Sequence, residues 1–292
     1  MEKDEVLAQV WLSRVPMQNK LRRSLLGNID AILNAYQLDP RGLRLTDLKD
    51  SLTQYKKQGI GVIVPSDDQY QRVFGSYQAL GFDVPFLLYI KGNQSLLDKS
   101  GIAVVGSRQA PLYAQRVTQE LVGGLQGLEA CIISGGAQGV DTKAHEVAMG
   151  RGLSTICVLG CGIGYDYPAL NKRLFKRLGQ EQLLISEYPP GTAPRRYQFP
   201  ERNRIIAQLS KAVVVTSAGK LSGSLITAER AMELDHPVLT VPWPLFEPCG
   251  EGCNFLLETG AQLITSGQHL REHLIAFGLI KEEEIKGLDP EE

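Results

Sequence analysis

The sequence predicts an α/β protein in which a mostly parallel sheet carries helices on both faces and follows a small helical domain. Three observations predict this class. Short apolar runs alternate with amphipathic segments from residue 60 onward, glycine-rich loops follow several of these runs, and the first 57 residues show helical spacing instead. Alternation of buried strands with helices of about 10–15 residues is typical of a parallel sheet.

The N-terminal region, residues 1–57, is expected to be helical. Its apolar residues recur at helical spacing in three groups, within residues 6–11, 21–36 and 45–55. Gly59 and Gly61 end this pattern. We therefore expect a helical domain over 1–57, an α/β domain over 58–270 and a short acidic tail over 271–292, whose last twelve residues hold six acids against Lys281 and Lys286.

The α/β domain is expected to contain eight strands and five helices between them. The predicted strands are 60–64, 86–90, 102–105, 131–133, 155–159, 183–185, 212–215 and 238–241. The predicted helices are 112–125, 142–149, 168–178, 201–209 and 224–234. In a sheet of this kind, ligands bind outside the carboxyl ends of the strands, where the helices begin.

Four loops at those ends are rich in glycine, and together they predict an anion-binding rim. They span residues 106–108, 134–141, 160–164 and 217–224. Glycine lets the backbone approach an anion closely, and the free N–H groups of a helix start favour negative charge. A single loop of this kind is equally well explained as a tight strand-to-helix turn, so the prediction depends on the set.

Residues 195–204 interleave four arginines with two aromatic rings. The segment contains Arg195, Arg196, Tyr197, Phe199, Arg202 and Arg204. Guanidinium groups grip phosphates, and aromatic faces stack on bases. The wider segment 172–204 has eight Lys or Arg against three Glu, whereas the whole chain has a net charge of −1. This contrast favours one basic face. The alternative is a solvated turn and helix whose arginines pair with nearby acids.

Composition excludes several other classes. The chain has 292 residues, of which 43% are hydrophobic, and no apolar run approaches the roughly 20 residues needed to cross a bilayer. The acidic N-terminus is atypical of a signal peptide. Five cysteines, an odd number, do not indicate a disulfide framework. We expect a cytoplasmic protein without a membrane association.

Nucleotide and catalytic motifs are not met, so we expect no enzyme activity, no cofactor and no metal. The phosphate loop of ATPases and the dinucleotide fingerprint are both missing. Asp141 and His145 are expected to form an ion pair or a helix cap, with a catalytic dyad as the alternative. Ser224 is expected to cap a helix. Asp166 and Glu187 are expected to orient arginines, with paired carboxylates as the alternative.

Seven short motifs, in fixed order over about residues 100–265, resemble the DprA/Smf family of bacterial DNA-processing proteins. They are Gly-Ser-Arg at 106–108, Ser-Gly-Gly-Ala-Gln-Gly-Val-Asp at 134–141 followed by Ala144 and His145, Thr-Ile-Cys-Val-Leu-Gly-Cys-Gly at 155–162, Tyr-Pro at 167–168, Ser-Glu-Tyr-Pro at 186–189, Phe-Pro-Glu-Arg-Asn-Arg-Ile-Ile at 199–206 and Ser-Gly-Ser-Leu-Ile-Thr at 222–227.

The resemblance implies an extended Rossmann-like domain that binds single-stranded DNA without catalysis, forms a homodimer and helps load the RecA recombinase during natural transformation. Arg108 and the loop 135–139 would contact phosphates, and Phe199 would meet a base with Asn203. The residues expected to bind nucleic acid are Gly106, Ser107, Arg108, Gly135, Gly136, Gly139, Arg195, Arg196, Phe199, Arg202, Asn203, Arg204, Ser222, Gly223 and Ser224.

The expected dimer contact involves Leu256, Leu257, Leu263 and Ile264. The alternative for these four residues is that they close the core of the monomer. The helical N-terminal region is similar to the sterile-alpha-motif-like domain of some family members. Many members carry a C-terminal winged-helix domain, for which the 22 residues after position 270 are too few, so we expect none.

Two positions depart from the family pattern. Thr216 replaces a common Glu after the seventh predicted strand, and Trp243 replaces a common Gly after the eighth. The alternative function is that of the lysine-decarboxylase-like phosphoribohydrolases, which cleave nucleoside monophosphates. Their Pro-Gly-Gly-x-Gly-Thr-x-x-Glu signature is absent from the corresponding region, residues 221–229, although that region closes with a glutamate, Glu229.

Overall fold

The structure is a computed structural model that describes residues 2–14, 31–32, 45–75 and 84–281. No helix within these ranges is both long and apolar enough to span a membrane. The chain divides into two compact units. The first contains residues 1–98, 135–137 and 156–209, and the second contains residues 99–134, 138–155 and 210–292.

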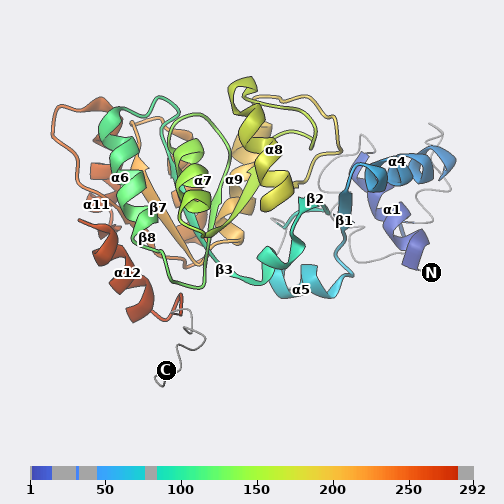
Figure 1. Cartoon of the computed structure of the whole chain (residues 1–292), viewed down its shortest axis with the longest axis horizontal. Helices are drawn as coiled ribbons and strands as arrows, with labels where there is room; N and C mark the ends of the chain where they lie inside the picture. Colours follow the sequence, from blue (N-terminus) through green and yellow to red (C-terminus); the bar gives the residue numbers. More distant parts are fainter. Residues whose placement is uncertain (1, 15–30, 33–44, 76–83, 282–292) are drawn as a thin grey trace, which may run out of the picture. The chain divides into compact units, whose positions relative to one another are not determined.

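The first unit begins with two helices, α1 (Glu2–Arg14) and α4 (Leu45–Lys57), which pack side by side (Figure 1). Arg14 links them: Nη2 donates to the hydroxyl of Tyr55 at 2.6 Å, and the guanidinium lies 5.7 Å from the same ring. Both helices match predicted helical groups. The remaining predicted group, residues 21–36, lies outside the described residues except for 31–32, which are helical.

Four strands of the first unit run in the order β1-β2-β6-β5. They are β1 (Ile60–Ile63), β2 (Leu88–Gly92), β6 (Leu183–Ser186) and β5 (Ser154–Leu159). β5 and β6 are parallel, whereas β2 is antiparallel to both β6 and β1. α5 (Asp68–Phe74), between β1 and β2, packs against the short helix η2 (Gln94–Asp98), which follows β2.

Two further helices complete the first unit. α8 (Lys172–Glu181) follows the short helix η3 (Ala169–Asn171) and packs against β2 and β6. It buries Leu174, Phe175 and Leu178 and exposes its lysines and arginines, because apolar residues three and four apart share one helix face. α9 (Gln198–Gln208) follows β6 and buries most of its length.

Five strands of the second unit run in the order β4-β3-β7-β8-β9, all parallel. They are β4 (Ala130–Ser134), β3 (Ser100–Gly106), β7 (Ala212–Ser217), β8 (Val238–Thr240) and the two-residue β9 (Gln262–Leu263). The residues of β4, β7 and β8 are all buried, which is expected of parallel strands that are covered on both faces.

Helices cover both faces of these strands. α6 (Leu112–Gly123) leads from β3 to β4, and α10 (Gly223–Glu233) leads from β7 to β8 on the other side of β3. Right-handed crossovers in opposite directions put these two helices on opposite faces. α7 (Val140–Gly150) and α12 (Gly267–Ala276) pack against α6, while α11 (Glu251–Glu258), which follows the short helix η4 (Pro248–Gly250), packs on β7 and β8.

The predicted fold class is confirmed, and all eight predicted strands are present. The main differences lie at element ends. β2 lies two residues later than predicted, α8 starts four residues later, after Pro168, and α9 starts three residues earlier, at Gln198. α5, α11, α12 and β9 were not predicted. The domain division at residues 57 and 270 stays a prediction, and residue 270 lies within α12.

α12 meets α6 at two glycines. A methyl group on Gly124 would lie 2.5 Å from Cα of Gly267, and one on Gly267 would lie 2.5 Å from the carbonyl oxygen of Glu120. We expect Gly124→Ala to lower the free energy of unfolding by about 1–3 kcal/mol through overpacking. Gly150→Ala is the control, because its new methyl meets no atom within 4 Å. Equal midpoints for the two variants in urea denaturation would contradict this contact.

Candidate nucleic-acid interface

In the first unit, a buried guanidinium holds two strand ends. Arg202 is only 5% exposed, and its Nη1 donates to the carbonyl of Gly135 at 2.6 Å and to the carbonyl of Val158. Its Nε donates to Oδ1 of Asn203 at 3.1 Å. Gly135 must lack a side chain here, because a Cβ would lie 2.2 Å from Nη1 of Arg202. Arg202 therefore positions the loop 135–137.

The same loop is held from a second direction. Nδ2 of the buried Asn171 donates to the carbonyl of Gly136 at 3.0 Å. Gly136 has a φ of +66°, and a Cβ there would meet Sγ of Cys157 and the ring of Phe175, each at 2.7 Å. A non-glycine residue would be disfavoured by both the left-handed conformation and the contact. The sequence of this loop is therefore explained by packing as well as by any ligand.

Arg204 is also buried and paired. It forms an ion pair with Oε2 of Glu187, and the two side chains are 10% and 11% exposed. Oε1 of Glu187 accepts a second hydrogen bond, from the backbone N–H of Phe86 at 2.9 Å. The expectation that Glu187 orients an arginine is confirmed. Asp166 instead pairs with Lys172, at 3.8 Å on the surface.

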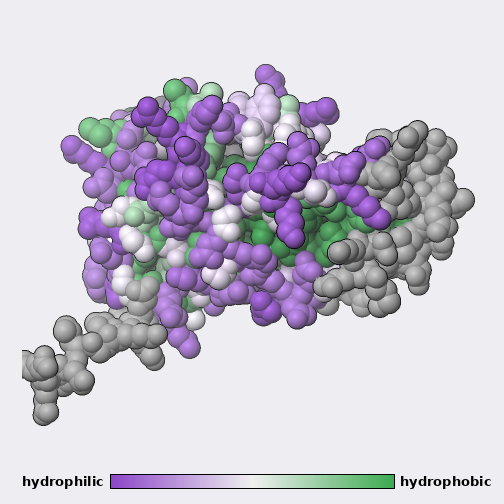
Figure 2. Space-filling view, turned by 45° about the vertical axis from the view of Figure 1, so that its right-hand side comes forward, coloured by the Kyte–Doolittle hydropathy of each residue, from purple (hydrophilic) through white to green (hydrophobic). Residues whose placement is uncertain are grey.

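The beginning of α9 carries the accessible part of the arginine–aromatic segment. Arg195, Arg196 and Tyr197 are exposed, whereas Phe199 is half-buried and packs against Gly160, where a Cβ would lie 2.7 Å from Cδ1 of the ring. Tyr167 lies beside Phe199, with ring centroids 5.4 Å apart. Figure 2 shows a mostly hydrophilic face with smaller hydrophobic areas. Tyr167 and Tyr197 are among the large hydrophobic residues that the protein exposes.

Tyr167 was not predicted as a site residue, and Tyr197 was predicted only as part of the arginine–aromatic segment. Tyr167 belongs to the Tyr-Pro motif at 167–168, for which the sequence indicated no role. Its pairing with Phe199 requires the fold, because Tyr167 lies in a loop and Phe199 lies in the first turn of α9, more than 30 residues later. Tyr197 was visible in the segment itself, and its 54% exposure now marks it as an available aromatic face.

In the second unit, three glycine loops converge at the ends of β3 and β7. The N–H of Ser107 donates to the carbonyl of Ser217 at 2.8 Å, and the carbonyl of Ser107 accepts from the N–H of Val140 at 3.2 Å. Gly139, with a φ of +82°, allows this approach, because a Cβ there would lie 2.3 Å from the Ser107 oxygen. Arg108 is exposed at the edge of this cluster.

Ser222 caps α10, which corrects the predicted cap at Ser224. The Ser222 hydroxyl accepts from the N–H of Ser224 at 3.4 Å, and the two hydroxyls are 2.7 Å apart. α10 begins at Gly223, so Ser224 already belongs to its first turn. The N-termini of α6, α7 and α10 therefore all lie near glycine loops at strand ends, where partial positive charge favours an anion.

Candidate nucleophiles in this region are buried. Burial raises the pKa of the Cys161 thiol to about 11, against a smaller opposite effect of Arg202, and Sγ donates weakly to the carbonyl of Tyr165. A thiol with this pKa is not a nucleophile at neutral pH. His145 is fully buried, with Nδ1 2.7 Å from the hydroxyl of Thr155, and so cannot reach a substrate.

The predicted residues divide between the two units. The first unit contains Gly135, Gly136, Arg195, Arg196, Phe199, Arg202, Asn203 and Arg204, and the second contains Gly106, Ser107, Arg108, Gly139, Ser222, Gly223, Ser224 and the four residues of the expected dimer contact. Among those four, Leu256 and Ile264 are buried, Leu257 is half-buried and Leu263 is exposed. Their roles toward a ligand or partner stay predictions.

The fold and the loops define a Rossmann-like protein whose glycine-rich strand ends suit a polyanion. A family model described as DNA recombination-mediator protein A matches residues 61–275. The chain belongs to this family.

Curated relatives agree with this assignment. The chain is 44% identical to the DNA processing protein DprA of Streptococcus pneumoniae over 187 residues, 64% of this chain and 66% of that protein. It is 36% identical to the DprA of Bacillus subtilis over 224 residues, 76% and 74% of the two chains. A Mycobacterium tuberculosis relative is 34% identical over 250 residues, 82% of this chain and 63% of its own length. The chain thus spans slightly less than two thirds of the pneumococcal and mycobacterial relatives.

Two solved structures are similar. The X-ray structure of the Streptococcus pneumoniae DprA has a TM-score of 0.74 at 33% identity and covers 91% of this chain and 92% of its own. The Helicobacter pylori DprA, whose structure concerns its single-stranded DNA binding mode, has a TM-score of 0.66 at 30% identity and covers 75% of this chain and 96% of its own.

Glu187 supplies a test of the packing under this site. We expect Glu187→Ala to lower the free energy of unfolding by about 3–5 kcal/mol, because it leaves the buried Arg204 without its partner charge. Glu181→Ala is the matched control, since it breaks an exposed pair with Arg177 and should leave stability unchanged. The measurement is guanidinium denaturation followed by circular dichroism. A loss below about 1 kcal/mol for Glu187→Ala would show that the buried pair is dispensable.

Proposed function

We propose that this chain is a non-catalytic, single-stranded DNA-binding protein of the cytoplasm that protects incoming strands and helps to load RecA during natural transformation. Family membership supports the proposal, as does the binding mode stated for the Helicobacter pylori relative. The observation that carries it is the exposed start of α9. There, Arg195, Arg196 and Tyr197 adjoin the Tyr167–Phe199 ring pair, which combines phosphate-binding and base-stacking groups on one unit.

The arginines of the first unit have two different roles in this proposal. Arg195 and Arg196, being exposed, contact phosphates directly. Arg202 and Arg204 are buried and support the site from within. Arg202, with Asn203, holds the loop 135–137, and Arg204 holds Glu187, which follows β6. Phe199 and Tyr167 stack on bases, each such contact contributing roughly 1–3 kcal/mol.

The second unit contributes backbone contacts. The loops around Gly106, Ser107 and Gly139 and the start of α10 at Ser222 place helix N-termini at strand ends, where the helix dipole favours phosphates, and Arg108 adds a charge. None of these contacts distinguishes one base from another. We therefore propose binding that tolerates any sequence, prefers single strands over duplex and weakens with salt.

The first expected outcome concerns the roles of Arg196 and Phe199. Arg196→Ala should weaken binding of a labelled oligothymidylate and reduce the salt slope by about 0.7, because one phosphate contact is lost. Phe199→Leu should weaken binding by roughly 1–3 kcal/mol, with an unchanged slope, because it removes stacking without removing charge. Fluorescence anisotropy at several salt concentrations measures both.

Arg72→Ala is the control for this titration, since Arg72 is an exposed arginine of α5 that pairs with Asp98. It should bind like the wild type. Circular dichroism checks that the Phe199→Leu protein is folded. The stacking assignment is wrong if this variant lowers the slope as much as Arg196→Ala does. The proposal as a whole fails if duplex of the same length binds as tightly as single strand.

The proposed absence of catalysis is testable with nucleoside monophosphates. Cys161 and His145 are buried, and Glu229, which stands at the closing glutamate of the phosphoribohydrolase signature, is exposed on α10. We expect no release of free base from any of the common nucleoside monophosphates, measured by chromatography. Glu229→Ala should give the same background. Turnover by the wild type that this variant loses would favour the hydrolase function.

We propose that self-association uses the exposed Leu263 and the half-buried Leu257, with the buried Leu256 and Ile264 supporting them from the core. Leu257→Arg and Leu263→Arg should each give a folded monomer by light scattering and circular dichroism, because a two-fold contact brings each new charge near its own copy. Phe277→Arg, at an exposed position beyond α12, is the control. A dimer that survives both leucine variants would place the contact elsewhere.

RecA loading rests on the family resemblance and on the strand binding proposed above. It is measured as RecA filament formation on strands already coated with a single-strand-binding protein. Acceleration by the wild type, and none by Arg196→Ala, is the expected result. An equal effect of both proteins would separate loading from strand binding.

A further inference from the structure

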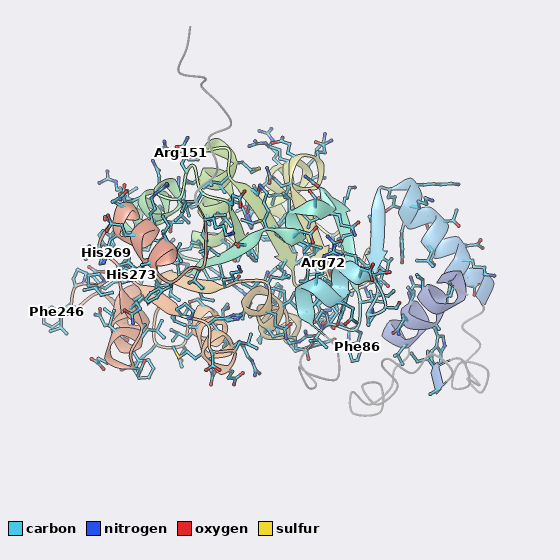
Figure 3. The ribbon with its side chains drawn as sticks, turned by 90° about the horizontal axis from the view of Figure 1, so that it is seen from below. Arg72, Phe86, Arg151, Phe246, His269 and His273 are labelled. Atoms are coloured by element: carbon cyan, nitrogen blue, oxygen red, sulfur yellow. The ribbon has the colours of Figure 1, made fainter. Side chains whose placement is uncertain are left out.

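We propose that α12 carries a binding site for a late first-row divalent transition metal, Cu(II) foremost, with His269 and His273 as its two protein ligands. The two residues are one helical turn apart on the same face of α12, in the second unit. Figure 3 shows them next to each other on this helix. This site is independent of the proposed DNA binding.

The two imidazoles converge through the same ring atom. Nε2 of His269 lies 2.9 Å from Nε2 of His273, the ring centroids are 4.6 Å apart, and the ring planes meet at 45°. Both side chains are half-buried, so solvent ions can reach them. Two imidazole Nε2 atoms this close together can chelate one ion, and imidazole is a preferred ligand of Cu(II), Ni(II) and Zn(II).

The separation of the nitrogens indicates which metals fit. With metal–nitrogen bonds of about 2.0–2.1 Å, two ligands at a right angle lie about 2.9 Å apart, whereas two tetrahedral ligands lie about 3.3–3.4 Å apart. The observed 2.9 Å matches the right angle of square-planar or octahedral ions. Cu(II) and Ni(II) prefer such geometries, and Cu(II) binds most tightly in the general order of affinities.

Neighbouring residues orient both rings. The hydroxyl of Thr265 lies 3.1 Å from Nδ1 of His269, so that nitrogen can donate its proton there and leave Nε2 with a free lone pair. The ring of Phe277 lies 5.5 Å from that of His273. Before metal binding, one Nε2 donates to the other. Metal binding replaces this contact, and the proton is then carried by Nδ1 of His273, so that both Nε2 atoms present lone pairs to the metal.

The site is assigned to binding and not to hydrolysis. Residues 269–273 read His-Leu-Arg-Glu-His, a spacing that zinc hydrolases use with further ligands. Here, the carboxylate of Glu272 accepts from Nε2 of Gln268 at 2.9 Å. Within the ranges that the structure covers, no cluster of three or more His, Cys, Asp or Glu suits a metal. The protein thus supplies two ligands, and water supplies the others.

The test is a Cu(II) titration of the tag-free full chain carrying Cys249→Ser, so that this half-buried thiol does not compete. Calorimetry gives the affinity and stoichiometry, and electron paramagnetic resonance reports coordinated nitrogens. We expect one Cu(II) per chain with nitrogen ligation and a raised midpoint of thermal unfolding. Thr265→Val should weaken binding by about tenfold, because it removes an orienting partner, and His269→Gln and His273→Gln should each weaken it by at least that factor.

His236→Gln is the matched control, since His236 is a half-buried histidine outside α12. This substitution should leave the affinity and stoichiometry of Cu(II) binding unchanged. Circular dichroism confirms that each variant is folded. The proposal is overturned if the wild type takes up no Cu(II). It is also overturned if His269→Gln and His273→Gln bind Cu(II) as tightly as the His236→Gln protein, because the ligands then lie elsewhere in the chain.

Discussion

The candidate site in the first unit depends on the hydrogen bonds that the buried guanidinium of Arg202 donates. A charge that is 5% exposed is tolerated only if hydrogen bonds replace the water that it loses. Carbonyls of Gly135 and Val158 and the amide of Asn203 provide that replacement. Gly135 follows β4 and Val158 lies near the end of β5, whereas Asn203 belongs to α9 itself. Satisfying one buried charge therefore also fixes the backbone of the proposed binding surface.

Side chains packed against these loops explain why three of their positions are glycine. A Cβ at Gly135 would clash with the Arg202 guanidinium, one at Gly136 with Cys157 and Phe175, and one at Gly160 with the ring of Phe199. Each of these glycines makes room for a side chain that is itself part of the site or of its support. The glycines are therefore not only turn formers, and an anion-binding role is compatible with their packing role because the backbone N–H groups are unaffected by it.

Sequence periodicity predicts the strands well because the central ones are buried on both faces, as in β3 and β7. It fails where an element is defined by its neighbours. β9 has only two residues, and α11 starts at Glu251 beside a glycine, so neither has a pattern of its own. The cap of α10 was misplaced because Ser222 and Ser224 both offer hydroxyls, and only the helix start decides between them.

The arginine–aromatic segment shows the same limit for the site. Charge counting treats Arg195, Arg196, Arg202 and Arg204 alike, yet the helix that starts at Gln198 turns the last two into the interior. The alternative of arginines paired with acids therefore applies to Arg204, whereas phosphate binding by Arg195 and Arg196 stays a prediction. Arg204 pairs with an acid, as the solvated-helix alternative required, but in a buried setting, whereas Arg195 and Arg196 stay exposed.

The two departures from the family pattern meet in the second unit and form a network of their own. The indole of Trp243 donates to the carbonyl of Thr216 at 3.1 Å, and the Thr216 hydroxyl lies 2.9 Å from that of Thr118. The side chain of Asn254 bonds both the N–H and the carbonyl of Trp243. Thr216 is thus satisfied from within and Trp243 is buried against it. Because β7 leads directly from Thr216 to Ser217 and the glycine loop that follows, the buried indole of Trp243 supports the start of that loop.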